Sequence, residues 1–109
     1  MLITGLNSQP KRELFGCKAR VVHSQFMTFV HWYFGAGDVI GGHAHPHEQV
    51  ATIIEGELDL TVGEETRRVG PGAVVVIPPN AHHSAKAITA CYVIDAFYPI
   101  REDYRASGG

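Results

Sequence analysis

The chain of 109 residues lacks most of the features that mark secreted, membrane-spanning or disulfide-rich proteins. It has only two cysteines, Cys17 and Cys91, which lie far apart and form no CxxC pattern. Cysteines this sparse predict no disulfide framework and are typical of a reducing cytoplasm. Purely apolar runs such as residues 73–77 are far shorter than the ~20 residues of a membrane helix. Residues 1–10 carry no basic start followed by an apolar stretch, so we expect no signal peptide and a cytoplasmic location.

Charge is also scarce. Charged residues make up 18% of the chain, the net charge is −2 and the pI is about 6.4, so neither sign dominates. We therefore expect no nucleic-acid partner and no membrane partner, because both attract clusters of basic residues. Apolar residues make up 45%, which is typical of a globular chain. This length supplies one core, since domains usually have ~100–200 residues, and residues 1–109 are expected to form a single domain.

Convincing helices are missing too, except for a candidate in the tail after Pro99. Short segments rich in β-branched and aromatic residues alternate instead with glycine and proline turns. The predicted strands are residues 20–22, 26–34, 42–47, 50–55, 57–62, 66–69, 73–77, 82–85 and 90–98. Strands of this length with turn signals every ~8–12 residues predict an all-β sandwich or barrel.

Histidine, by contrast, is abundant: five of the seven fall in two clusters, His43/His45/His47 and His82/His83. Residues of equal parity on a strand face the same side, so His43 and His45 point together. Gln49 joins them if the strand continues without a bulge. Two such histidines supply adjacent corners of a metal polyhedron, and a further ligand must come from a neighbouring strand. His82 and His83 face opposite sides, so one of them is expected to turn inward.

A histidine pair of this kind can also be plain polar surface, and motif matches carry a known false-positive risk. We expect that role for His47 and His82. The wider spacing favours a metal site, because it resembles the two motifs of the cupin superfamily. The first motif is matched by Gly37, His43, His45, Gln49 and Gly56 in order. The second is matched by Gly72, Pro78, Asn80 and His83, after the short spacer of small bacterial cupins.

This resemblance implies an all-β fold made of a single cupin barrel, a double-stranded β-helix or jelly roll. Its core would span about residues 26–98, with N-terminal strands in 1–25 and a short tail at 99–109. The resemblance also implies one divalent transition metal, Ni, Mn, Fe or Zn. Its ligands would be His43, His45, Gln49 and His83, with His83 chosen over His82 by its motif position.

Three positions depart from the cupin pattern. Gln49 stands where most cupins have Glu, Asn80 replaces a turn glycine, and Ala87 replaces an Asn. Asn tolerates the left-handed conformation, so the second change is mild. The Gln49 change leaves the charge of a divalent ion uncompensated, which favours an anionic substrate and Lewis-acid chemistry on oxygen. Whether the bonds before Pro78 and Pro79 are cis is left open.

The predicted strand at residues 90–98 alternates between two mostly apolar faces, so one lines the barrel and the other packs outward. Asp95 is the exception, since a carboxylate among apolar neighbours must be paired or functional. Arg101 is a candidate partner, and a purely structural Asp95–Arg101 salt bridge stays an open alternative. Trp32, Phe34, Tyr92 and Tyr98 are expected at the surface, where they would support a symmetric homodimer.

The run of residues 95–104 looks like the ending of small cupins of pectin degradation, the KdgF type. Residues 43–49 and 76–80 show the same likeness. This resemblance implies a usually dimeric cupin that opens the ring of a 4,5-unsaturated uronate to a linear keto acid. It also implies active-site roles for Asp95, Phe97 and Arg101. One position departs: Ala51 stands where these proteins tend to have a polar residue, which puts the sugar substrate in question.

The leading hypothesis is therefore a metal-dependent cupin that acts on a small oxygenated carboxylate. Asp95 would relay a proton, Phe97 would wall the site, and Arg101 would hold a carboxylate through two parallel hydrogen bonds. One alternative is an Fe(II)-dependent cupin dioxygenase, and another is a non-catalytic protein that binds a metal or small ligand. His31 and Tyr33 share a strand face and are expected to be ordinary core or surface residues.

Overall fold

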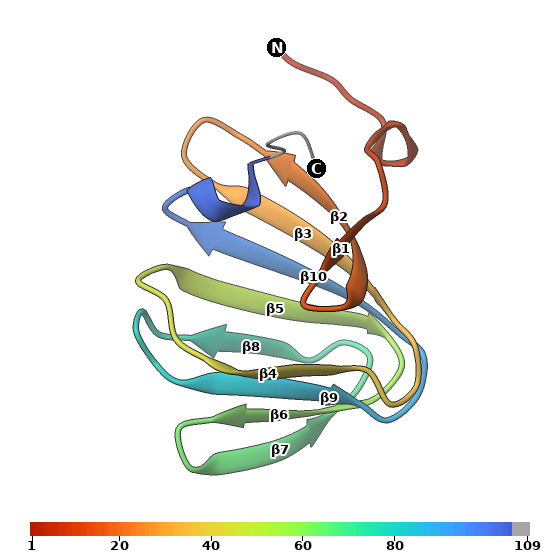
Figure 1. The fold of residues 1–109 in the computed structure, drawn as a ribbon, viewed down its shortest axis with the longest axis vertical. Coiled ribbons are helices and arrows are strands. Elements are labelled where there is room, and N and C mark those ends of the chain that lie inside the picture. The colour runs from red at the N-terminus through yellow and green to blue at the C-terminus, as the bar shows by residue number, and fades with distance from the viewer. Residues whose placement is uncertain (106–109) are drawn as a thin grey trace.

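The computed structural model describes residues 1–105 and contains two antiparallel sheets (Figure 1). The six-stranded sheet has the order β1 (Arg12–Leu14), β2 (Cys17–His23), β3 (Thr28–Phe34), β10 (Cys91–Tyr98), β5 (Glu48–Glu55), β8 (Val74–Ile77). The four-stranded sheet has the order β4 (Val39–His43), β9 (His83–Ala87), β6 (Leu58–Val62), β7 (Glu65–Val69). Two 3-10 turns, η1 (Leu6–Ser8) and η2 (Glu102–Tyr104), complete the described elements. The predicted all-β jelly-roll fold is confirmed.

The core lies between the two sheets and follows the period-two alternation of the strands. On β3, Val30, Trp32 and Phe34 are buried, and on β10 the same is true of Val93 and Phe97. Side chains of Leu58, Leu60 and Ala87 meet them from the four-stranded sheet. Fully burying a side chain of this size contributes ~1.5–3 kcal/mol, so this interior provides most of the stabilisation that closes the barrel.

The burial of Trp32 and Phe34 corrects one prediction. Both side chains face the core, with exposed fractions of 2% and 6%, instead of lying on the surface. Their aromatic character alone led to the surface prediction, but both belong to the set of β3 side chains that faces inward. Tyr92 is half-buried and Tyr98 exposed on the outer face of β10. The homodimer stays a prediction, and its aromatic support is reduced to these two tyrosines.

The predicted strand at residues 42–47 is wrong in its second half. β4 ends at His43, and residues 44–47 form an irregular connection before β5 begins at Glu48. Pro46 lies in this connection and has no backbone N–H, so it cannot continue a strand ladder. The prediction also lacked the short β1, and the described part of the tail, residues 100–105, contains the single 3-10 turn η2 and no longer helix.

The turn conformations agree with the sequence predictions more closely than the strand boundaries do. Asn80 adopts φ 66°, the left-handed conformation expected of the residue that replaces a turn glycine. Gly56, between β5 and β6, has φ 85°, which most other residues would resist. The cis peptide bond among residues 1–105 joins Tyr98 to Pro99, whereas the bonds before Pro78 and Pro79 are trans.

One end of the barrel gathers the segments that matter for function. The β4–β5 and β8–β9 connections and the turn η2 all lie at the left end of Figure 1. The backbone N–H of Arg101 donates to the Thr28 hydroxyl at 2.8 Å, which fastens the tail to the start of β3. Residues 106–109 of the predicted tail lie outside the described residues. Within residues 1–105, no helix has the length and hydropathy to span a membrane.

Candidate metal centre

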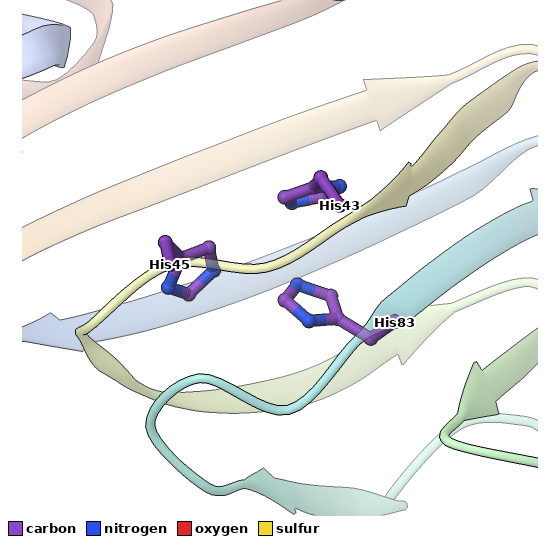
Figure 2. Close-up of side chains that lie close together, drawn as sticks. All are labelled: His43, His45 and His83. Atoms are coloured by element: carbon purple, nitrogen blue, oxygen red, sulfur yellow. The ribbon is translucent and has the colours of Figure 1, made fainter.

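Three histidines from separate segments converge at this end of the barrel. Figure 2 shows His43 at the end of β4, His45 on the connection that follows, and His83 at the start of β9. One ring nitrogen from each lies within 4.8 Å of the others. His43 and His83 face each other in the β4–β9 pairing, with ring centroids 4.3 Å apart. The fold therefore brings the two sequence clusters together as a group that can hold a metal ion.

The orientation of two of these rings is fixed by backbone carbonyls. Nδ1 of His43 lies 2.9 Å from the Gly41 carbonyl oxygen, and Nδ1 of His83 lies 2.9 Å from that of Ala81. A carbonyl only accepts, so each Nδ1 carries the proton and each Nε2 presents a lone pair. Nε2 of His83 is buried and has no hydrogen-bond partner among residues 1–105. A buried, unpartnered lone pair that faces two other imidazoles is what a metal ligand requires.

Gln49 on β5 completes the group. Its Oε1 lies 3.1 Å from Nε2 of His45. Ligand atoms placed ~2.1 Å from one ion at a right angle would be about 3 Å apart, so this spacing fits two adjacent ligands. Gln49 faces the histidines although the extended segment assumed from parity is broken after His43. The inward position comes from β5 itself, where Gln49 is 7% exposed.

Electrostatics keep the imidazoles in the form that binds metals. Burial lowers the pKa of His45 to about 4, and the positive charge of Arg101 adds to this effect. Burial also lowers the pKa of His83. Both rings are therefore neutral at neutral pH. Three neutral imidazole nitrogens and one amide oxygen form a donor set that fits a divalent transition metal.

The two remaining clustered histidines differ from each other. His82 is exposed, as predicted, and its ring lies against the backbone of Gly42. His47 is half-buried instead of exposed, with its ring edge-on to His45 at 5.4 Å. Its Nδ1 is buried, and no residue from 1 to 105 supplies a hydrogen-bond partner. Burial lowers the pKa of His47. It forms a second layer around His45 and is not plain surface.

A cavity between the sheets opens beside the three histidines. Its polar lining consists of His43, Gln49, His83, Ser84 and Asp95. The rest of its wall is largely apolar and includes Trp32, Ala51, Phe97 and Tyr104. A mostly apolar pocket with a few convergent polar groups is the usual form of a small-molecule site. The predicted residues Asp95 and Phe97 are thus both brought to the cavity wall.

Asp95 is the carboxylate of this wall, and it is 5% exposed. Its Oδ2 accepts hydrogen bonds from Trp32 Nε1 at 2.8 Å and from Gln49 Nε2 at 2.9 Å, while Oδ1 is buried and has no partner in the part of the chain that the structure describes. Burial raises the pKa of Asp95 to about 6, against the two hydrogen bonds, which lower it. A carboxyl group that titrates near neutrality is suited to proton transfer.

Arg101 pairs differently from the prediction. Its Nε and Nη2 donate to the carboxylate of Asp103 at 3.0 and 2.7 Å, so the Asp95–Arg101 salt bridge that the sequence left open as an alternative does not form between these residues. The guanidinium lies over the rings of Phe97 and Tyr104, at 4.7 and 4.0 Å. Nη1 finds no partner among the described residues, and the Nε and Nη2 atoms expected to hold a substrate carboxylate are already bonded to Asp103. Unlike Asp95 and Phe97, Arg101 is not part of the cavity wall.

Sequence reasoning missed four residues of this region. Tyr104 closes the cavity from η2, and burial raises its pKa to about 12. Phe15 stacks on His43 with ring centroids 5.4 Å apart. Trp32 donates a hydrogen bond to Asp95, and Asp103 accepts hydrogen bonds from Arg101. The parity of Trp32 with Val30 could have indicated an inward side chain, but nothing in the sequence links Phe15 to the site.

The family comparison agrees with this arrangement. The sequence model of the cupin domain matches residues 30–97, which is more than half of the chain. The chain therefore belongs to the cupin family. The match covers His43, His45, Gln49, His83 and Asp95, and it ends at Phe97.

Solved structures indicate which kind of cupin the chain is similar to. An RmlC-like cupin from Shewanella frigidimarina superposes with a TM-score of 0.86 at 27% identity, covering 93% of each chain. KdgF from Halomonas sp. superposes with a TM-score of 0.82 at 28% identity, covering 89% of this chain and 92% of its own. The protein is thus a small cupin similar to the KdgF type, as the sequence motifs predict.

A more distant likeness concerns the fold alone. Oxalate decarboxylase from Bacillus subtilis has a TM-score of 0.80 at 21% identity, over 88% of this chain and 29% of that longer one. The search of curated proteins finds no match. Assignment of an activity therefore depends on the chemistry of the cavity.

Proposed function

We propose that the protein is a metal-dependent cupin that acts on a small oxygenated carboxylate, with a 4,5-unsaturated uronate as the leading candidate. The observation that carries this proposal is a group of three convergent imidazoles, two of which, His43 and His83, line the same small cavity as the buried carboxyl of Asp95. The likeness to KdgF from Halomonas sp. over most of both chains supports the choice of substrate class.

His43, His45, Gln49 and His83 would hold the metal. A bound divalent ion would supply Lewis-acid polarisation of a substrate oxygen. Because all four ligands are neutral, the site would keep a net positive charge and favour an anionic substrate. The cavity wall excludes water through Phe97, Trp32 and Tyr104, which are all buried. Low exposure strengthens the electrostatic interactions made inside the site.

The remaining chemistry would belong to Asp95. In the proposed reaction, the hydroxyl on the hemiacetal carbon loses its proton and the bond from that carbon to the ring oxygen breaks. An aldehyde and an enol result, and the enol takes up a proton on carbon to give the keto acid. The net change is an isomerisation, which consumes neither water nor an oxidant. Asp95 would move the proton at Oδ1, because Oδ2 already accepts two hydrogen bonds.

Arg101 would act through its positive charge at this end of the barrel, because its guanidinium lies over Phe97 and Tyr104 and does not line the cavity. This attraction replaces the two parallel hydrogen bonds expected from the sequence. Ala51 pairs with Asp95 across β5 and β10 and leaves the cavity apolar at that point. The site therefore offers the sugar ring fewer polar contacts than the KdgF resemblance implies, which favours a small or sparsely hydroxylated substrate.

The test begins with metal analysis of the purified protein and continues with 4,5-unsaturated galacturonate. We expect about one equivalent of bound metal and loss of the enol-ether absorbance. A chelator should abolish this activity and added metal should restore it. Asp95→Asn should lower kcat by ~10²–10⁴, the usual contribution of a positioned acid–base group. Metal-loaded protein that leaves the absorbance unchanged would contradict the uronate activity, and oxygen uptake with Fe(II) would favour the dioxygenase alternative.

A further inference from the structure

Asp95 is held at the centre of the six-stranded sheet by its two neighbouring strands. Trp32 on β3 and Gln49 on β5 are diagonal neighbours of Asp95 on β10, because Val93 pairs with Trp32 and Phe97 pairs with Gln49. Long side chains reach across such diagonals. Both donate to the same oxygen, Oδ2, at 2.8 and 2.9 Å. All three side chains are buried, so water does not replace these hydrogen bonds.

This arrangement decides which end of the Gln49 amide faces the histidines. The indole N–H of Trp32 can only donate, so Oδ2 of Asp95 acts as an acceptor. The amide must then turn its NH₂ group toward Asp95, since a carbonyl oxygen there would place two acceptors against each other. Oε1 is left facing Nε2 of His45, at 3.1 Å. A rotated amide would present N–H to a cation and could not bind it.

The same contact also places a negative charge next to a neutral ligand set. The four candidate ligands carry no charge, and the nearby Asp103 is already paired with Arg101. We propose that Asp95, oriented by Trp32, is a positioning residue that aims the Gln49 carbonyl at a divalent cation and supplies the negative charge that a Glu ligand would carry. This inference rests on the metal site of the proposed function and is independent of the uronate chemistry.

The pairing also accounts for the departure from the cupin pattern at position 49. A Glu there would set a second carboxylate about 3 Å from Asp95, and like charges at that distance cannot both be ionised. Gln49 and Asp95 therefore form a matched pair in which the negative charge lies on Asp95, the hydrogen-bond partner of the ligand, and not on the ligand itself. Placing the negative charge on the ligand requires both changes together, Gln49→Glu with Asp95→Asn.

The experiment measures the affinity of the metal-free protein for Ni²⁺ by calorimetry and records the d–d absorption spectrum of the complex. Asp95→Ala should weaken binding ~10–100-fold, the usual cost of removing a residue that orients a metal ligand. Asp95→Asn keeps an acceptor for both donors but loses the charge, and should weaken binding about tenfold. Trp32→Phe should have a smaller effect in the same direction, because Gln49 still contacts Asp95.

Rescue separates this role from a merely structural one. The double variant Gln49→Glu/Asp95→Asn should bind Ni²⁺ at least as tightly as the wild type, because the carboxylate becomes a direct ligand. Ile94→Ala, a truncation next to Asp95 on the opposite face of β10, serves as the matched control and should leave the affinity and spectrum unchanged. Thermal melting of each metal-free variant checks folding, and Asp95→Asn carries the test if Asp95→Ala does not fold.

Three results would overturn the inference, in whole or in its charge-transfer part, and they are distinguishable. Wild-type binding combined with unchanged affinity in both Asp95 variants would refute the positioning role and leave the metal site intact. Absence of Ni²⁺ binding in the folded wild type would refute the metal site and the inference together. Loss in Asp95→Asn without recovery in the double variant would show that the charge was not transferred through Gln49.

Discussion

The two sheets hold their candidate ligands in different ways. In the four-stranded sheet, His43 and His83 each use Nδ1 to bind a carbonyl oxygen two residues earlier in the chain. In the six-stranded sheet, Gln49 donates to Asp95, 46 residues away, and Asp95 accepts from Trp32, 63 residues away. The imidazoles are thus oriented by their own segments, whereas the amide is oriented only after three strands have assembled.

This difference in how the ligands are oriented determines which of them should tolerate substitutions in the core. A local hydrogen bond needs almost no loop closure and survives repacking elsewhere. A buried side-chain network depends on every member, because a buried donor that is left without its acceptor destabilises the protein by the full desolvation penalty of that donor. The imidazoles should therefore tolerate changes in the core, while the orientation of Gln49 should be sensitive to them.

The largest effect is expected from removing an imidazole. His83→Ala should weaken metal binding by more than 100-fold, beyond the ~10–100-fold cost of an orienting residue, because a direct ligand is lost. His82→Ala provides the matched control, since His82 is the adjacent residue and is exposed. Calorimetric titration of both variants with Ni²⁺ measures the difference.

The control also tests the choice between the two neighbours. His82→Ala should change the affinity less than threefold, because His82 packs on the backbone of Gly42 and presents no buried lone pair. Equal losses in both variants would mean that ligation is shared or that the strand shifts by one residue. Either result would contradict the claim that local hydrogen bonds fix the imidazoles of the four-stranded sheet.

The features that the sequence predicts are those with short-range causes. Strand periodicity puts His82 and His83 on opposite sides, and the cupin motif selects His83 as the inward one. Turn chemistry accounts for the left-handed Asn80. Alternation on the last strand puts Asp95 and Phe97 on one face, and the KdgF resemblance assigns that face to the site. These predictions use the period of two in a strand, one residue's backbone preference and the spacing of a family motif.

The features that it does not predict depend on partners far away in the sequence. Trp32 is inward because its face of β3 packs in the core with Leu58 and Leu60 of the other sheet, and its parity with Val30 is the local signal that points to this face. The Asp103 pairing of Arg101 was missed for another reason: a buried carboxylate, Asp95, was the more obvious partner, but two hydrogen-bond donors already satisfy its Oδ2. Composition and spacing carry no information on such competition.

A second prediction concerns the point where the chain passes from one sheet to the other. Gly56 links β5 to β6, and a Cβ there would lie 2.1 Å from the Ala90 carbonyl oxygen, besides requiring φ 85°. Gly56→Ala should lower the free energy of unfolding by about 2–5 kcal/mol, from left-handed strain of ~1–2 and overpacking of ~1–3. Urea denaturation of the metal-free protein measures this change.

Gly63→Ala is the matched control for that experiment. Gly63 also has a left-handed conformation, φ 61°, but a Cβ there would meet nothing within 4 Å. It should cost about 1–2 kcal/mol, the strain alone. If the two variants lose equal stability, the long-range contact with Ala90 does not constrain the turn, and the glycine acts only through its backbone freedom.

The smallest effect is expected where a local hydrogen bond orients a charged group of the tail. Asp103→Asn should raise KM for 4,5-unsaturated galacturonate about tenfold and change kcat less, because Arg101 loses one charge-assisted hydrogen bond worth ~1.5 kcal/mol. Glu102→Gln, an exposed neighbour that pairs with Arg105, should stay within twofold of the wild type. Steady-state kinetics separate the two parameters. A lower KM would mean that Asp103 competes with the substrate for the guanidinium fork, and Arg101 would then bind carboxylates through two hydrogen bonds after release.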